Sequence, residues 1–289
     1  MSYGERRKTP EEVAVDMTNV SRLLPLLRCL RCGEEVEPRD QALECRGCGA
    51  SYPVINDIPV LLEGDEEEQV WRDYFDRLGG KKGDSETANS YLSRRNFLFV
   101  RKHLLRLAGE VRGLPVLDVG CGTGHFSQSL AANNFLAGVD ISLQMAGHAV
   151  KKGLAVAQSS GRKLPFAAGC FALVIANNVI QSFKDSRQFI GELARVAKPG
   201  GRIILSATNS QNISLKLFRL AERKKYRHLG LHTAEGLRQG LESAGVSVRT
   251  VLFLHYPIEN VRMIPGGRAF SRFDTFFSST VALEAVKDE

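Results

Sequence analysis

The chain has 289 residues, 43% of them apolar and 25% charged, a balance typical of a soluble globular protein. This length accommodates one α/β domain of about 180–200 residues and a smaller unit. No apolar run reaches the ~18 residues that a membrane-spanning helix needs, and residues 1–10 lack the apolar core of a signal peptide, so we expect a cytoplasmic protein. The net charge of +7 favours an acidic partner only weakly.

Four of the six cysteines form two Cys-x-x-Cys-Gly motifs. Each motif predicts a knuckle, in which a turn points two thiolates at one point and the glycine that follows takes a positive φ angle. Two knuckles separated by a short hairpin predict a tetrahedral metal site made by Cys29, Cys32, Cys45 and Cys48. Because four thiolates leave no open position for a substrate, we expect structural zinc. The alternatives are iron in its place and a ribbon that has lost its metal.

Residues 52–62 contain two apolar segments separated by Asn56-Asp57, which predicts two short strands joined by a turn. With the knuckles, this segment resembles the zinc-ribbon-like small activator subunit of tRNA and release-factor methyltransferases, a module also fused ahead of some bacterial methyltransferases. We therefore predict a flexible N-terminus over residues 1–22, a zinc-ribbon-like β domain over 23–62 and a linker over 63–90. Apolar residues at helical spacing around Trp71 predict a short linker helix that packs on a neighbour or over a cofactor pocket.

Residues 91–289 alternate apolar strand patterns with helical patterns. An amphipathic helix is predicted over residues 89–111, and further helices over 123–133, from 142, over 186–197 and over 233–244. Strands are predicted over 116–119, 135–139, 155–157, 171–176, 202–207, 246–254 and 278–286. Because no helix separates the last two strands, one of them should run antiparallel. We predict an α/β, Rossmann-like fold with a seven-stranded, mostly parallel sheet and one antiparallel strand.

The first strand of this domain ends in a glycine-rich turn that begins at Gly120 and ends at Gly124. Glycines let a ligand approach the backbone, and an acid at the end of the next strand, Asp140, can accept hydrogen bonds from ribose hydroxyls. The turn fails the NAD fingerprint because His125 stands where the third glycine would be. The pattern therefore suits a nucleoside cofactor without a pyrophosphate.

The glycine-rich turn resembles motif I of the class I S-adenosylmethionine-dependent methyltransferases. Further segments match the family in the expected order, at residues 139–145, 164–166, 170–177 and 195–202. The resemblance covers residues 90–287 and is to the type of domain found in ubiquinone and menaquinone biosynthesis. It implies S-adenosylmethionine as the methyl donor and in-line displacement at its sulfonium as the mechanism.

The resemblance also implies which residues bind the cofactor. Glycines of the turn approach its amino-acid portion, the acid before the turn orders the loop or meets the ammonium through water, and the acid after the second strand holds the ribose. An isoleucine and a methionine flank the adenine, and an asparagine contacts the methionine end or the acceptor. The implied residues are Asp118, Gly120, Cys121, Gly122, Gly124, Asp140, Ile141, Met145, Ser160 and Asn177. Asp118 as a turn-capping acid and Met145 as a core residue are the plain alternatives.

Two positions depart from the family pattern. Ser160 stands where relatives usually carry an acid that accepts a hydrogen bond from the adenine amine, and Gln181-Ser182 stands where they often carry a histidine. The second change removes the expected general base, so either the acceptor needs none or another group supplies it. Besides Asn177 and Gln181, the polar candidates near the mouth are Asn178, His228 and His232. Loss of activity is a further alternative.

The insertion at 209–231 lies where this fold usually determines acceptor specificity. Residues 215–228 predict a basic amphipathic helix or lid. Three interpretations remain open: a solvated helix, a surface for phosphorylated or membrane-associated substrates with peripheral membrane contact through 213–228, and an RNA contact. Our leading hypothesis is a methyltransferase for a small-molecule or lipid- or sugar-linked acceptor. The alternatives are an rRNA or tRNA methyltransferase with the zinc module docking RNA, and a non-catalytic cofactor-binding scaffold.

Overall fold

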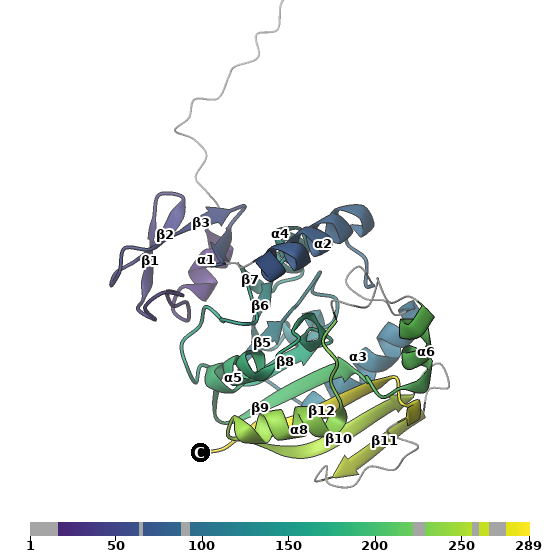
Figure 1. Ribbon diagram of the computed structural model, residues 1–289. Coiled ribbons are helices and arrows are strands. Elements are labelled where there is room, and N and C mark those ends of the chain that lie inside the picture. Colours follow the sequence, from purple (N-terminus) through teal and green to yellow (C-terminus); the bar gives the residue numbers. More distant parts are fainter. Residues whose placement is uncertain (1–16, 64–65, 88–92, 222–228, 256–259, 266–275) are drawn as a thin grey trace, which may run out of the picture.

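A computed structural model describes residues 17–63, 66–87, 93–221, 229–255, 260–265 and 276–289, and Figure 1 shows the arrangement of its elements. The N-terminal part contains one short helix and four short strands, which are α1 (Thr18–Leu23), β1 (Val36–Arg39), β2 (Ala42–Cys45), β3 (Ser51–Ile55) and β4 (Ile58–Leu61). Two longer helices, α2 (Glu66–Lys82) and α3 (Arg94–Ala108), lead from there to the main sheet.

Seven strands in the order β7-β6-β5-β8-β9-β12-β10 form the main sheet. They are β5 (Pro115–Val119), β6 (Phe135–Asp140), β7 (Ala155–Ser159), β8 (Phe171–Asn177), β9 (Ala197–Thr208), β10 (Val246–His255) and β12 (Thr280–Lys287). β5 to β9 pair in parallel, whereas β12 is antiparallel to both of its neighbours. This confirms the predicted fold class. A further edge strand, β11 (Asn260–Pro265), pairs antiparallel with β10 and was not predicted.

Helices cover both faces of this sheet, which explains why its central strands are apolar throughout rather than alternating. On one face, α3 and α4 (Leu143–Val150) bury Phe97, Leu104 and Ala146. On the other face, α5 (Arg187–Val196) and α8 (Ala234–Ser243) bury Phe189 and Leu237. α6 (Ile213–Ala221) follows β9 and lies at the far end of the sheet from the ribbon strands (Figure 1).

One predicted helix is wrong. Within residues 123–133 the structure has only turns and a short 3₁₀ helix, η1 (Gln128–Leu130). The φ angles of Gly120, Gly122 and Gly124 are +72°, +54° and +81°. These values lie in the left-handed region, which is incompatible with a right-handed helix, so the chain leaves the strand through successive turns. The predicted cap at Ser142 is confirmed, because its hydroxyl accepts a hydrogen bond from the Met145 N–H at 3.2 Å.

The N-terminal strands join the edge of the main sheet. β4 pairs in parallel with β7, so the sheet order continues as β1-β2-β3-β4-β7. Helix α1 docks on the same strand: the Asn19 amide donates to the Val156 carbonyl at 2.9 Å and accepts from the Val156 N–H at 2.7 Å. The Asp57 carboxylate accepts the N–H groups of Asn19 and Val20. The flexible N-terminus predicted over 1–22 is therefore wrong for 18–22, while residues 1–16 lie outside the described part.

Candidate functional site

A pocket lies at the carboxyl ends of the central parallel strands, the edge at which open α/β sheets bind ligands. Its walls are the glycine turn after β5, the end of β6, the segment after β7 and the loop after β8. Helix α2 adds Glu68, Trp71 and Phe75 to the lining. The two aromatic rings are stacked, with centroids 5.8 Å apart and planes inclined by 21°. The pocket is therefore bounded by polar strand ends below and by an apolar helix face.

Packing in the turn requires glycine at two positions. A Cβ atom on Gly120 would lie 2.8 Å from the Val179 side chain, and one on Gly124 would lie 3.0 Å from the Ala149 Cα. Gly120 lines the pocket, whereas Gly124 packs against α4. The Gly122 N–H donates to the Asp140 carboxylate at 2.7 Å. The turn is thus tied to the acid at the end of β6.

Two carboxylates are buried at the floor of the pocket. Asp118 accepts a 2.5 Å hydrogen bond from the Ser127 hydroxyl, and burial raises its pKa to about 7, with the charge of Asp140 adding to the increase. Burial likewise raises the pKa of Asp140 to about 6, although the N–H groups of Ser142 and Gly122 oppose the shift by donating to this carboxylate. The hydrogen-bond partners of the two acids in the described structure are Ser127, Gly122 and Ser142, which carry no charge, so both acids suit a ligand that carries donors or positive charge.

Helix α2 is fixed to the pocket by several contacts. The Asp76 carboxylate accepts the Ser142 hydroxyl at 2.6 Å and the Gln144 N–H at 3.3 Å, which caps α4 from outside. Gly79 packs so closely on α4 that a Cβ there would lie 3.2 Å from the Met145 Cγ. At the start of α2, the Glu68 carboxylate accepts a hydrogen bond from the Ser160 hydroxyl. The linker helix predicted around Trp71 therefore covers the pocket.

The loop after β8 carries unsatisfied amides. Among the described residues, Asn178 Oδ1 and Gln181 Oε1 are buried and have no hydrogen-bond partner, and both residues line the pocket. Asn178 has a φ angle of +55°, a conformation that asparagine tolerates. Asn177 instead accepts the Ser206 hydroxyl at 2.7 Å. The two orphaned carbonyl oxygens can accept hydrogen bonds from a ligand.

His232 supports this loop from behind. Its Nε2 lies 3.1 Å from the Ile180 carbonyl and 3.2 Å from the Phe183 carbonyl, and the Gly230 N–H donates to the Gln181 carbonyl at 2.7 Å. Burial lowers the pKa of His232. These contacts indicate a neutral imidazole that donates from Nε2 and holds the 3₁₀ turn η2 (Ile180–Ser182). His232 is not among the pocket-lining residues, and His228 lies outside the described residues.

The pocket brings together most of the predicted site residues. Those that line it are Asp118, Gly120, Cys121, Asp140, Ile141, Met145, Ser160 and Asn177, whereas Gly122 and Gly124 lie behind the lining. Glu68, Arg162 and Val179 are among the lining residues that the sequence reasoning missed. In the sequence, only the helical spacing of apolar residues around Trp71 indicated that α2 could contribute to the pocket. The cofactor roles of all these residues stay predictions.

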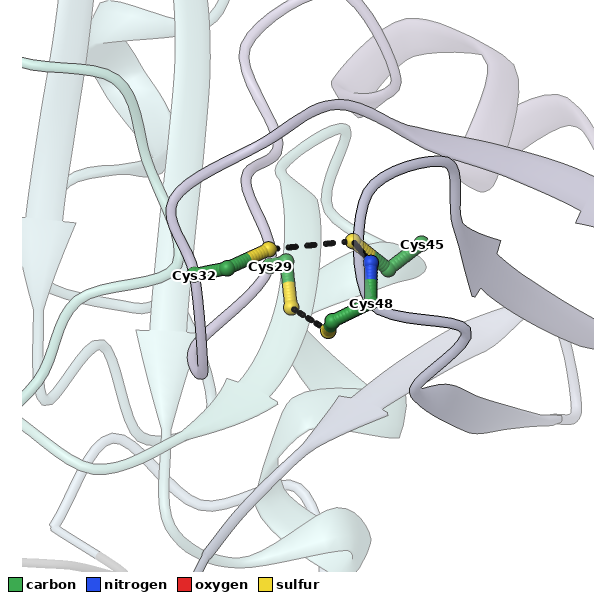
Figure 2. A group of neighbouring side chains, drawn as sticks. All are labelled: Cys29, Cys32, Cys45 and Cys48. Atoms are coloured by element: carbon green, nitrogen blue, oxygen red, sulfur yellow. Dashed lines mark hydrogen bonds between the residues drawn. The ribbon is translucent and has the colours of Figure 1, made fainter.

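A second site lies in the ribbon strands, where Figure 2 shows the side chains of Cys29, Cys32, Cys45 and Cys48 gathered between two turns. Their sulfur atoms all lie within 4.8 Å of one another. The Sγ atoms of Cys32 and Cys45 are 3.3 Å apart, and those of Cys29 and Cys48 are 3.6 Å apart. Tetrahedral zinc with bonds of about 2.3 Å places its sulfurs roughly 3.8 Å apart, so the four thiols could hold this ion.

The two knuckles have matching backbone geometry. The Arg31 N–H donates to Cys29 Sγ and the Gly47 N–H donates to Cys45 Sγ, both at 3.3 Å. The glycines that follow, Gly33 and Gly49, have φ angles of +81° and +68°, which confirms the predicted positive φ. Backbone donors stabilise thiolates, the form of cysteine that binds metal.

Comparisons with known proteins agree with this fold. Residues 117–205 match a family model described as "Methyltransferase domain". The demethylmenaquinone methyltransferase of Lactococcus lactis is 27% identical over 169 residues, which are 54% of this chain and 67% of that protein. The chain spans about half to two thirds of the length of the first curated relatives that it matches.

Two solved structures share the fold. Magnesium protoporphyrin IX methyltransferase from Synechocystis PCC 6803 with bound S-adenosylhomocysteine has a TM-score of 0.56 and 22% identity, over 77% of this chain and 100% of that one. A chain from the complex of the Haloferax volcanii Trm112 methyltransferase activator with a protein assigned as a methyltransferase has a TM-score of 0.57 and 18% identity, over 74% and 98%. The predicted resemblance is confirmed: residues 117–205 match a methyltransferase domain, and these solved structures share its fold. No described helix is long and apolar enough to cross a membrane.

Proposed function

We propose that this protein is a methyltransferase that binds S-adenosylmethionine in the pocket at the ends of β5 to β8 and methylates a small-molecule or lipid- or sugar-linked acceptor. The observation that carries the proposal is the pair of buried acids, Asp118 and Asp140, on either side of a glycine turn that leaves the backbone open to a ligand. Bound S-adenosylmethionine supplies a methyl group on a sulfonium, which a nucleophile takes by in-line displacement.

The residues of this chain bind the cofactor and orient it. Asp140 accepts the ribose hydroxyls, and the turn at Gly120 receives the amino-acid portion while Asp118 favours its positive charge. Ile141 and Met145 pack on the base. Trp71 and Phe75 restrict the access of water from above. Positioning of this kind supplies most of the rate where the donor is already activated.

The acceptor meets the loop after β8. This end of the pocket is polar without being strongly charged. Asn178 and Gln181 offer amide groups there, and Ser182 and Thr208, the last residue of β9, offer hydroxyls. The quinone and porphyrin named for the Lactococcus and Synechocystis proteins support a small-molecule acceptor. We propose RNA only as the alternative outcome of the experiment below, because Arg162 is the only arginine or lysine among the described residues that line the pocket, whereas RNA binding depends on clustered basic side chains.

We also propose that the four thiolates of the ribbon hold structural zinc. The matched N–H donors on Cys29 and Cys45 and the sulfur separations support this ion. All four ligand positions would be filled by the chain, so the metal would stabilise the ribbon and take no part in methyl transfer. Cytoplasmic location remains a prediction.

Calorimetry with S-adenosylmethionine and S-adenosylhomocysteine tests the shared premise on zinc-loaded protein. We expect micromolar binding, and no binding would remove the proposal. Replacement of Asp140 by alanine should lower the affinity for S-adenosylhomocysteine by about 10–100-fold, since a charged hydrogen bond contributes roughly 1.5–3 kcal/mol. Transfer of tritium from labelled S-adenosylmethionine into an organic extract, rather than into total RNA, would support the small-molecule acceptor.

A further inference from the structure

The order of the strands sets the direction in which a nucleoside lies across the sheet. β6 stands between β5 and β7, and its terminal acid, Asp140, is the ribose-binding group of the proposed function. The 5′ substituent of the ribose extends towards the glycine turn after β5. Because the base leaves the ribose on the other side of the ring, it must extend towards the end of β7.

The end of β7 offers the base one carboxylate. Ser160, Gly161 and Arg162 line the pocket there, and Glu68 reaches the same place from α2. The Glu68 side chain is only 12% exposed, and it lies 4.0 Å from the Arg162 guanidinium. It accepts the hydroxyl of Ser160, and a carboxylate can accept several hydrogen bonds on its two oxygens. Glu68 is thus a nearly buried acceptor at the position where the base edge arrives.

We propose that Glu68 recognises the adenine of the cofactor by accepting a hydrogen bond from its exocyclic amine, so that helix α2 forms part of the nucleoside site. The inference rests on the proposed binding of S-adenosylmethionine. Ser160 orients the Glu68 carboxylate through its hydroxyl. The carboxylate is supplied by a segment that lies between the ribbon and the methyltransferase domain rather than within the match at 117–205.

The contacts of α2 hold Glu68 in place before the ligand binds. Asp76 caps α4 two turns further along the helix, and Gly79 packs on Met145, a pocket residue. After the helix, the Asp84 carboxylate pairs with His125 at 3.0 Å. A side chain fixed in this way selects its partner more sharply than a mobile one, because less conformational freedom is lost on binding.

The test compares two ligands by calorimetry on the full zinc-loaded chain. S-adenosylhomocysteine carries the amine, and S-inosylhomocysteine carries a carbonyl oxygen in its place. The unmodified protein should bind the adenosyl compound about 10–100-fold more tightly, since the oxygen faces the carboxylate without a hydrogen. Glu68→Met should reduce this ratio to within about threefold, and Glu68→Gln, which keeps a carbonyl acceptor, should restore part of it.

Glu66→Gln is the matched control, because Glu66 is exposed on the first turn of the same helix. It should leave both affinities unchanged. If Glu68→Met weakens both ligands equally, or leaves the ratio as it was, Glu68 does not contact the amine and the inference is overturned. If the unmodified protein binds neither ligand, the proposed function itself fails, which separates the two results.

Discussion

At the scale of single residues, the two buried acids link cofactor binding to pH. A carboxyl whose pKa is raised in the folded state holds its proton more tightly there than in the unfolded chain. The free energy of unfolding therefore falls as pH rises from about 4 towards the folded pKa, which is about 7 for Asp118 and about 6 for Asp140. A ligand that favours the ionised acids should bind more tightly above this window.

Asp118→Asn tests this pH dependence. The amide cannot ionise, so the ligand-free variant should gain stability relative to the unmodified protein by on the order of 2 kcal/mol between pH 5 and pH 8. Urea unfolding at several pH values measures the difference. A constant difference across this range would show that Asp118 ionises normally. The same variant should bind S-adenosylmethionine less tightly at pH 8, because the carboxylate charge is lost.

Gln181 tests the acceptor end of the pocket. Its amide oxygen is buried without a partner in the described structure, so a bound acceptor with an N–H or O–H group would satisfy it. Gln181→Met should lower methyl transfer into an organic extract about 10-fold while the affinity for S-adenosylhomocysteine stays unchanged. Gln188→Met makes the same change at an exposed position on α5 and should have no effect. Equal loss of cofactor affinity in Gln181→Met would place this residue at the cofactor instead.

At the scale of elements, α2 joins the ribbon to the pocket. Near the end of this helix, Gly79 lies against α4. The next residue, Gly80, has open space around it. Both glycines lie within the helix, where alanine is favoured by about 0.5–1 kcal/mol. Comparing an alanine substitution at each glycine therefore separates the effect of helix propensity from the effect of the close contact with α4.

Gly79→Ala should be less stable than Gly80→Ala by about 1–2 kcal/mol, because the added methyl group must displace Gln144 or Met145. Thermal unfolding in the absence of ligand gives the comparison. The affinity for S-adenosylhomocysteine should fall only in Gly79→Ala, since Met145 lines the pocket. Equal stability of the two variants would mean that α2 can move away from α4 at no cost.

The sequence predicted the elements of the central sheet because their apolar runs and glycine turns are local signals. It failed where distant contacts decide the conformation. The helix expected from Thr123 does not form, because the glycines on both sides of this residue are left-handed, with Gly120 packed on Val179 and Gly124 on Ala149. Helix α1 was missed because the side chain of Asn19 finds its partners on β7. Similarly, the sequence shows Ser160 where relatives usually carry an acid, and only the fold reveals that the Glu68 carboxylate lies beside this serine.

At the scale of the whole molecule, the ribbon and the methyltransferase sheet are continuous. β4 pairs with β3 of the ribbon segment on one side and with β7 of the methyltransferase sheet on the other. α2 begins only a few residues after β4 ends, so the position of the pocket cover depends on how β4 is held. A metal that stabilises the knuckles should therefore influence a pocket that it does not touch.

Cys45→Ser, or removal of zinc by a chelator, tests this coupling. Loss of one thiolate weakens the metal site, and structural zinc contributes on the order of several kcal/mol to folding. We expect a lower melting temperature together with a severalfold loss of affinity for S-adenosylhomocysteine, both restored when zinc is returned to the chelated protein. Cys170→Ser is the control, because Cys170 lies outside the four-cysteine cluster, and its thiol donates to the Ala167 carbonyl as a serine hydroxyl also can. Metal analysis establishes which samples hold zinc. Unchanged affinity in metal-free protein that is still folded would show that α2 keeps its place on α4 through Asp76 and Gly79 alone, so that the ribbon and the pocket are independent.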